Sequence, residues 1–207
     1  MPFKLFELCR TKAPWGDYGN MLVHGMTGYL GRDSRRRLQL QRTGPFVPPI
    51  TMPGVGVVVV CDRVRERLGS SGLTGLQFRA DILKQVVELD WEGWDRTACL
   101  PRRLPPGGEP ENYFLRGRHR PELAKGIGPL WEVYSDKTVE LVEDGTETLC
   151  GMEFPRMLPD RDTWPVQDFC SAGRGSQLLV TGKARRVVER LSGGTVTGVE
   201  RPWASRS

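Results

Sequence analysis

The sequence has little that would place it in a membrane or in a secretion pathway. Apolar residues make up only 38% of its 207 residues, and no apolar run approaches the roughly 20 residues that a membrane span requires. The opening residues, MPFKLFELCR, are too short an apolar stretch and too charged for a signal peptide. We therefore expect no membrane span and a cytoplasmic protein.

Paired cysteines and histidines are also scarce. The cysteines are odd in number, widely spaced and never arranged as C-x-x-C, which argues against both a disulfide framework and a zinc ribbon. Two histidines, His24 and His119, are too few for most metal sites. The five cysteines are Cys9, Cys61, Cys99, Cys150 and Cys170.

Common catalytic signatures are absent as well. The sequence contains no G-x-x-x-x-G-K-[ST], no H-E-x-x-H and no G-x-S-x-G. A nucleophile–base couple of a histidine with Cys9 or Cys150 stays open, and so does an enzyme of unfamiliar type that uses His24 or His119. We favour a non-enzymatic protein with no catalytic residue, no cofactor and no bound metal.

Two similar stretches, residues 55–78 and 178–201, are the most regular part of the chain. Each begins with an aliphatic run typical of a buried strand, passes through a short amphipathic helix and a glycine-containing turn, and ends in a second extended piece. A gapless alignment of the two pairs Val64 with Val187. The pattern predicts two copies of one strand-helix-turn-strand module; convergence of two ordinary units is the alternative.

The length of the chain suits a single α+β domain, residues 1–207, or one divided into two lobes. The 25 glycines and 16 prolines predict many irregular connections. Residues 101–110, PRRLPPGGEP, are the strongest linker candidate and would separate an N-terminal half, 1–100, from a C-terminal half, 111–207. We expect a strand-rich α+β fold whose two modules are joined by irregular Pro/Gly-rich segments.

Alternation of apolar and polar residues predicts further strands outside the modules. It favours strands within residues 3–8 and 82–91, and two short strands within 131–142. Leu38 and Leu40 alternate with glutamines and predict a half-buried strand after a basic turn. Residues 143–146, E-D-G-T, are typical of a hairpin turn.

A basic cluster raises the possibility of a nucleic-acid partner. The net charge is only +5, but closely spaced arginines can neutralise phosphates and so drive non-specific binding. No RRM, zinc-finger or helix-turn-helix signature accompanies the cluster, so a solvated turn is the preferred interpretation and an acidic protein partner a further alternative. The cluster comprises Arg32, Arg35, Arg36, Arg37 and Arg42.

Tryptophan, arginine and aspartate residues in turn-rich surroundings are the candidates for protein–protein contact. Tryptophan and arginine are enriched at interface hot spots, and loops on a rigid scaffold often carry recognition. The D-x-D pair at 160 and 162 could also hold a divalent cation, although the neighbouring prolines favour a turn. The candidates are Trp91, Trp94, Arg102, Arg103, Asp160, Asp162, Trp164 and Asp168.

Three segments resemble a known bacterial group. They are VVVVCDRVRERLGSSGLTGLQF (57–78), RHRPEL with WEVY (118–123, 131–134), and WPVQDFCSAGRGSQLLVTGKARRVVERL leading into TVTGVE (164–200). Together they are similar to the double-CXXCG paralogue family of myxobacteria and to immunity-type proteins of polymorphic toxin systems. The paired C-x-x-C-G motifs of that family are missing here, and Cys9 and Cys150 stand alone, so no zinc-site residue carries over.

The resemblance implies a protein that neutralises a cognate toxin by tight protein–protein binding. We therefore expect a non-enzymatic binding protein that occludes its toxin through loops carried on the two modules. A nucleic-acid-binding or regulatory protein that uses residues 32–42 is the alternative.

Overall fold

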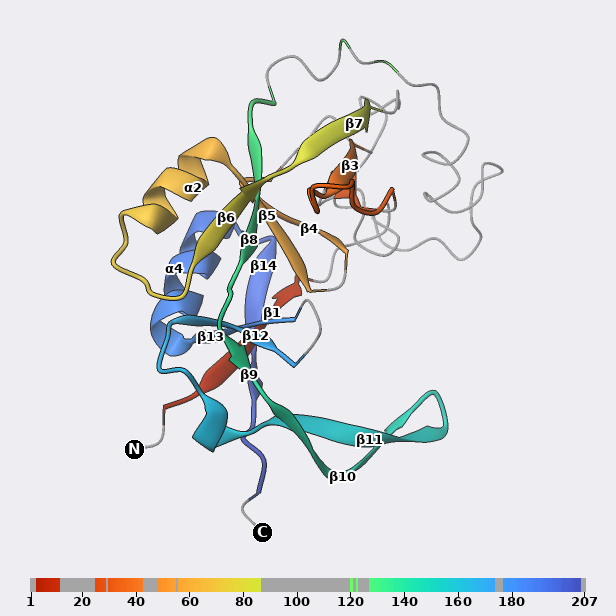
Figure 1. Cartoon of the computed structure of the whole chain (residues 1–207), viewed down its shortest axis with the longest axis vertical. Helices are drawn as coiled ribbons and strands as arrows, with labels where there is room; N and C mark the ends of the chain where they lie inside the picture. The colour runs from red at the N-terminus through yellow and green to blue at the C-terminus, as the bar shows by residue number, and fades with distance from the viewer. Residues whose placement is uncertain are drawn as a thin grey trace.

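The structure, a computed structural model, describes residues 3–11, 25–28, 30–42, 48–54, 56–86, 120, 122, 127–173 and 177–205 (Figure 1). These residues form a strand-rich α+β fold with two α-helices, which confirms the predicted fold class. The helices are α2 (Asp62–Gly69) and α4 (Gly182–Ser192), and a short 3-10 turn, η3, spans Arg161–Thr163.

Two larger sheets carry the helices. The first has the strand order β14 (Val196–Arg201), β1 (Leu5–Arg10), β13 (Leu178–Thr181), β12 (Phe169–Ala172) and β9 (Thr138–Val139). The second has the order β4 (Ile50–Gly54), β5 (Val57–Cys61), β8 (Leu130–Tyr134) and β6 (Gln77–Ala80).

Two smaller sheets complete the described strands. One contains β2 (Met26–Thr27), β3 (Gln39–Arg42) and β7 (Ile82–Val86), and the other is a hairpin of β10 (Leu141–Leu149) and β11 (Met152–Pro159). The hairpin projects from the rest of the described chain (Figure 1). Within the described residues, no helix is long and apolar enough to cross a membrane.

Each helix directs one apolar stripe into the core. Val64 and Leu68 on α2, and Ala184 and Val188 on α4, are buried and spaced four residues apart, which places each pair on one helix face. The hydroxyl of Thr181 caps α4 by accepting the N–H of Ala184 at 3.4 Å. The predicted strand-helix-strand order is therefore present in both modules.

The two halves of the chain exchange central strands. β1, from the N-terminal half, lies between β13 and β14 and runs antiparallel to both. β8, from the C-terminal half, lies between β5 and β6 and is also antiparallel to both. Each module thus encloses a strand from the other half, so both larger sheets contain strands from residues 1–100 and from residues 111–207.

The two enclosed strands also occupy the same register. Trp131 of β8 and Phe6 of β1 lie opposite equivalent residues of β5 and β13. The guanidinium of Arg65 on α2 lies 4.3 Å from the Trp131 ring, and that of Arg185 on α4 lies 4.5 Å from the Phe6 ring. Both modules therefore place a cation over the aromatic residue of the strand they enclose.

The residue pairs of the sequence alignment do not match this arrangement. α2 starts at position 62 and α4 at position 182, an offset of 120, whereas the alignment uses 123. Buried Val64 therefore corresponds to buried Ala184 rather than to half-buried Val187. A shift of three residues is close to one helical turn and nearly preserves an amphipathic pattern, so the pattern alone could not fix the register. Duplication of an ancestral module stays a prediction.

One apolar core joins the two halves. Phe6, Val60, Leu68, Phe169 and Val188 all belong to the same buried cluster, although they come from five different elements, some inside the two modules and some outside them. Burying each such side chain contributes roughly 1.5–3 kcal/mol. The exchanged strands and the shared core therefore stabilise both modules together.

Most strands predicted outside the modules are present, but the hairpin turn was misplaced. β1, β7, β8 and β9 confirm the strands expected near residues 3–8, 82–91 and 131–142. Residues 143–146 lie inside β10, where the register shifts at Gly145 (φ 81°), and the turn is formed by Cys150 and Gly151. Asp-Gly favours a β-bulge as well as a turn, which explains the error. Residues 101–110 lie outside the described residues.

Gly75 lies against the backbone of β12, so substituting it tests how closely the N-terminal half packs against the C-terminal half. Its φ is +74°, and a Cβ there would meet the carbonyl oxygen of Phe169 on β12 and approach the Cβ of Gln167 to 2.9 Å. Gly72 has a similar φ of +68° but open space around it. We expect Gly75→Ala to lower the free energy of unfolding by more than about 3 kcal/mol, and Gly72→Ala by only about 1 kcal/mol. Urea unfolding would measure both. Equal losses would show that backbone conformation, and not the contact with β12, decides the cost.

Candidate recognition face

The loop between β11 and β12, residues 160–168, contains four of the predicted contact residues. Asp160 starts it by accepting the backbone N–H of Asp162 at 3.0 Å, which caps η3. The turn expected from the D-x-D sequence is thus present. No group of three or more His, Cys, Asp or Glu side chains among the described residues could hold a metal ion. We call residues 160–168 the recognition loop.

Three aromatic rings fix the middle of the recognition loop. Trp164, only 7% exposed, has its ring centroid 5.7 Å from that of Phe3 and 5.8 Å from that of Trp203. The centroids of Phe3 and Trp203 lie 5.3 Å apart, and the indole N–H of Trp203 donates to the carbonyl of Phe3 at 3.2 Å. This aromatic cluster joins the loop to segments from both ends of the chain.

A cavity of about 600 Å³ opens beside the aromatic cluster, between the start of β1, the recognition loop and the first turn of α4. It combines apolar walls with a rim that carries more positive than negative charge. Asp168 is the carboxylate among its lining residues. The apolar walls come from Phe3, Phe6, Trp164 and Val166, and the cations of the rim are Lys4, Lys183 and Arg186. We call this cavity the recognition pocket.

Val166 stands at the edge of the recognition pocket in a strained conformation. Its φ is +56°, a region that a β-branched residue rarely adopts, and its side chain is 85% exposed. Such a backbone conformation costs on the order of 1–3 kcal/mol. An apolar side chain that is both strained and exposed gains nothing for the isolated fold.

Asp168 holds the far end of the recognition loop in place. Its carboxylate accepts the hydroxyl of Thr181 at 2.7 Å and the backbone N–H of Thr74 at 3.2 Å, and it lies 3.4 Å from Nζ of Lys183. Burial raises the pKa of Asp168, but these hydrogen bonds and the Lys183 charge outweigh it and leave the pKa below its usual value. Asp168 therefore positions the loop rather than offering an unpaired charge to a partner.

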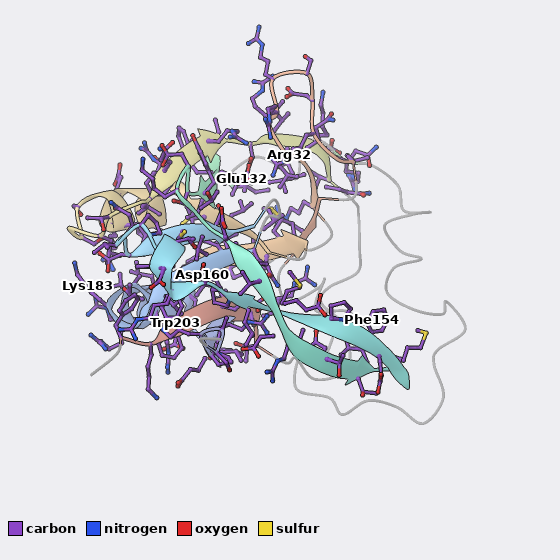
Figure 2. The ribbon with its side chains drawn as sticks, turned by 60° about the horizontal axis from the view of Figure 1, so that its bottom comes forward. Arg32, Glu132, Phe154, Asp160, Lys183 and Trp203 are labelled. Carbon is purple, nitrogen blue, oxygen red and sulfur yellow. The ribbon has the colours of Figure 1, made fainter. Side chains whose placement is uncertain are left out.

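A second cavity, of about 560 Å³, lies on the other side of the aromatic cluster. Trp203 and Val142 contribute its apolar lining, and its three carboxylates, Glu143, Asp160 and Asp162, outnumber the one cation, Arg161, so the lining is acidic. Glu143 and Val142 belong to the base of the β10–β11 hairpin. The recognition loop thus separates a pocket with a basic rim from an acidic cavity that continues onto the hairpin. Figure 2 shows Asp160, Lys183 and Trp203 in this part of the molecule.

The predicted arginine cluster does not form a single exposed array. Arg32 donates to Oε2 of the buried Glu132 at 2.7 Å (Figure 2), and Arg37 pairs with Asp33 at 2.8 Å. Arg42 lies in β3 and is only 8% exposed, and the preceding Gln41 is only 4% exposed, so this end of the strand is buried on both faces. Of the predicted cluster, Arg35 and Arg36 are the side chains that are exposed without a described ion pair.

Asp81 lies beside the Arg32–Glu132 pair and contrasts with Asp168. Both of its carboxylate oxygens are buried, and among the described residues neither has a partner at good hydrogen-bond geometry. Burial, together with the nearby Glu132 carboxylate, raises the pKa of Asp81 to about 7. The fold therefore tolerates Asp81 best in its protonated form.

The other predicted contact residues, Trp91, Trp94, Arg102 and Arg103, lie outside the described residues, as does Cys99. The remaining cysteines are free thiols, and burial raises the pKa of Cys170 to about 12. Sequence reasoning missed Phe3, Lys183, Arg186 and Trp203, because only the fold brings both chain ends to the recognition loop. Nothing in the W-P-V-Q sequence indicates the positive φ of Val166.

Comparison of the chain with protein-family models, with curated proteins and with solved structures finds no match.

Substituting Asp168 and Asp81 by asparagine should change stability in opposite directions. An aspartate with a lowered pKa stabilises the fold above its unfolded value of about 3.9, and this contribution disappears as pH falls through the folded pKa. Asp168→Asn should therefore lower the free energy of unfolding by about 1–3 kcal/mol at neutral pH and have less effect in acid.

The raised pKa of Asp81 has the reverse consequence. Its ionisation costs stability progressively as pH rises from about 4 to about 7. Asp81→Asn should therefore stabilise the protein above about pH 7 and lose this advantage below about pH 4. Chemical unfolding across this pH range measures both variants, with exposed Asp136→Asn as the control. Destabilisation by Asp81→Asn at alkaline pH would contradict the assignment.

Proposed function

We propose that this chain is a non-enzymatic binding protein that recognises a partner protein through its recognition loop and recognition pocket. The observation that carries the proposal is Val166, an apolar side chain held 85% exposed at φ +56° above an apolar pocket. Strain of this kind persists where the surrounding structure enforces it, and it concentrates at functional sites. A partner that covers Val166 would turn this costly conformation into a contact.

The lining of the pocket suggests the chemistry of the contact. Phe3 and Trp164 provide apolar and aromatic surface, while Lys183 and Arg186 are exposed cations at the rim. An apolar side chain flanked by carboxylates would satisfy both parts of this lining. Complementary charge of this kind mainly sets association rate and specificity, whereas the buried apolar anchor supplies affinity.

Neutralisation of a toxin in the cytoplasm is the biological role we propose for this binding. The support is the resemblance of the module segments to immunity-type proteins, together with a rigid scaffold that presents one loop to a partner. Occlusion requires no catalytic group in this chain. The toxin's own surface would need an apolar residue with neighbouring acidic groups.

The arginine-rich segment gives the nucleic-acid alternative less support. Arg35 and Arg36 would neutralise about two phosphates, and each phosphate contact adds about 0.9 to the salt dependence of binding. Such a site would bind weakly at moderate salt. Nuclease treatment distinguishes it from a protein partner.

Substitution of Val166 tests the proposed recognition. Tagged wild-type protein should recover one stoichiometric partner from its source cells at moderate salt, both before and after nuclease treatment. With that partner purified, Val166→Asp should weaken binding by at least about tenfold, roughly 1.4 kcal/mol, in calorimetry. Val199→Asp is the matched control, because Val199 is 49% exposed but lines neither cavity.

Val166→Gly separates strain from recognition. Glycine adopts a positive φ without steric cost, so this variant should raise the free energy of unfolding by about 1 kcal/mol. It should still lower the affinity for the partner, because the valine side chain is missing. If both Val166 variants bound the partner as tightly as the wild type, the recognition loop and the recognition pocket would not be the binding site. For the toxin role, the partner produced alone should stop cell growth, and co-production of this chain should restore growth. A harmless partner would contradict neutralisation.

A further inference from the structure

Exposed apolar side chains concentrate on two places in the described structure. Eight large apolar residues are exposed, and five of them lie on the β10–β11 hairpin, residues 141–159. Two others, Phe3 and Val166, line the recognition pocket, and Val199 is the last. The five on the hairpin are Val142, Leu149, Met152, Phe154 and Met157.

The tip of the hairpin presents an apolar face. Leu149 lies opposite Met152, and Glu147 lies opposite Phe154, so these four side chains share one side of the ribbon. Leu149 is 53%, Met152 60% and Phe154 40% exposed. The two strands pair only with each other within the described residues, and an isolated two-stranded hairpin is marginally stable in water. A cover over this face would stabilise it.

The hairpin is acidic, whereas the rest of the chain is basic. Glu143, Asp144, Glu147 and Glu153 against Arg156 give the hairpin a charge of −3, so the other residues sum to +8 in a chain of +5. Two acidic hairpins would repel each other if they paired. The surface that suits the tip is an apolar hollow with a basic rim.

The recognition pocket is such a surface. It offers apolar walls at Phe3, Trp164 and Val166 and exposed cations at Lys183 and Arg186. Within one molecule the tip lies away from the pocket: Figure 2 shows Phe154 on the projecting hairpin, far from Lys183. Each strand of the hairpin extends roughly 25–30 Å at about 3.4 Å per residue, which is long enough to reach across to a second molecule.

We propose that the hairpin tip of one copy of this chain docks in the recognition pocket of a second copy. The apolar side chains of the tip then cover Phe3, Trp164 and Val166, while Glu147, on the same side of the ribbon, approaches Lys183 and Arg186. The inference uses the pocket of the proposed function, so the second copy occupies that pocket until the partner protein displaces it. Self-association and partner binding are therefore competitive.

Charge reversal on the purified full-length chain tests this docking. Sedimentation velocity over a range of concentrations should show a reversible dimer or larger assembly of the wild type. The assembly should weaken as salt rises from about 0.1 M to about 1 M, where the Debye length falls from about 10 Å to about 3 Å. Glu147→Lys in the hairpin, or Lys183→Glu with Arg186→Glu in the pocket rim, should each weaken association at least about tenfold.

Restoring the complementary charges distinguishes docking from misfolding. Mixing the hairpin-reversed protein with the pocket-reversed protein should restore association, because each hairpin then meets a rim of opposite charge. Arg190→Glu, an exposed position on α4 outside the pocket lining, is the matched charge control. For the apolar contact, Phe154→Ser should weaken association and Val199→Ser should leave it unchanged.

The outcomes separate this inference from the proposed function. The proposed docking would be wrong if the wild type were a monomer at every concentration. It would also be wrong if Lys183→Glu with Arg186→Glu did not weaken association, and that result would indicate pairing of hairpins with each other. Neither result involves the partner protein, whose binding is measured with the Val166 variants. If the Val166 variants lost partner binding but still self-associated like the wild type, the pocket would bind the partner and would not bind the hairpin of a second copy.

Discussion

The exchange of β1 and β8 between the two modules is the constraint on which the other features depend. Neither the five-stranded nor the four-stranded sheet is complete without a central strand from the other half. Because a central strand has hydrogen-bonded neighbours on both sides, removing it would expose two strand edges at once. The helices then pack on sheets that are already shared, and their buried stripes meet in one core. Cooperative folding of both modules follows from this connectivity.

The exchange also explains how the recognition loop is held. β1 begins just after Phe3, and β14 ends just before Trp203, so the two neighbouring strands of one sheet bring both residues to Trp164. At the other end of the loop, Asp168 connects Thr74 of the first module with Thr181 of the second. A loop fixed at both ends by different modules can hold Val166 in a conformation that it would otherwise leave.

The sequence predicted features set by local patterns and missed those set by long-range contacts. Alternation and turn residues located both modules and most strands. They could not show that β1 and β8 cross between halves, because strand pairing at that separation depends on the whole chain. The same limit applies to single residues: Arg42 has the sequence context of an exposed arginine but lies in a covered strand. A contact loop at residues 160–168 was predicted, whereas the cations of the pocket and the positive φ of Val166 were not.

The distribution of charge also follows from the exchanged strands, because the core that they share is apolar and leaves the charged side chains on the surface. The exchanged core tolerates few charges. The buried Glu132 is paired with Arg32, and its carboxylate, together with burial, leaves the neighbouring Asp81 favouring its protonated form. Charges that cannot enter the core lie on the surface, acidic on the hairpin and basic around the first turn of α4. The hairpin also carries exposed apolar side chains, and the exposed Phe3 and Val166 line the pocket beside the first turn of α4. A molecule whose two unburied apolar surfaces have opposite charge is complementary to itself, so a true partner must offer a better fit to the pocket than the hairpin does.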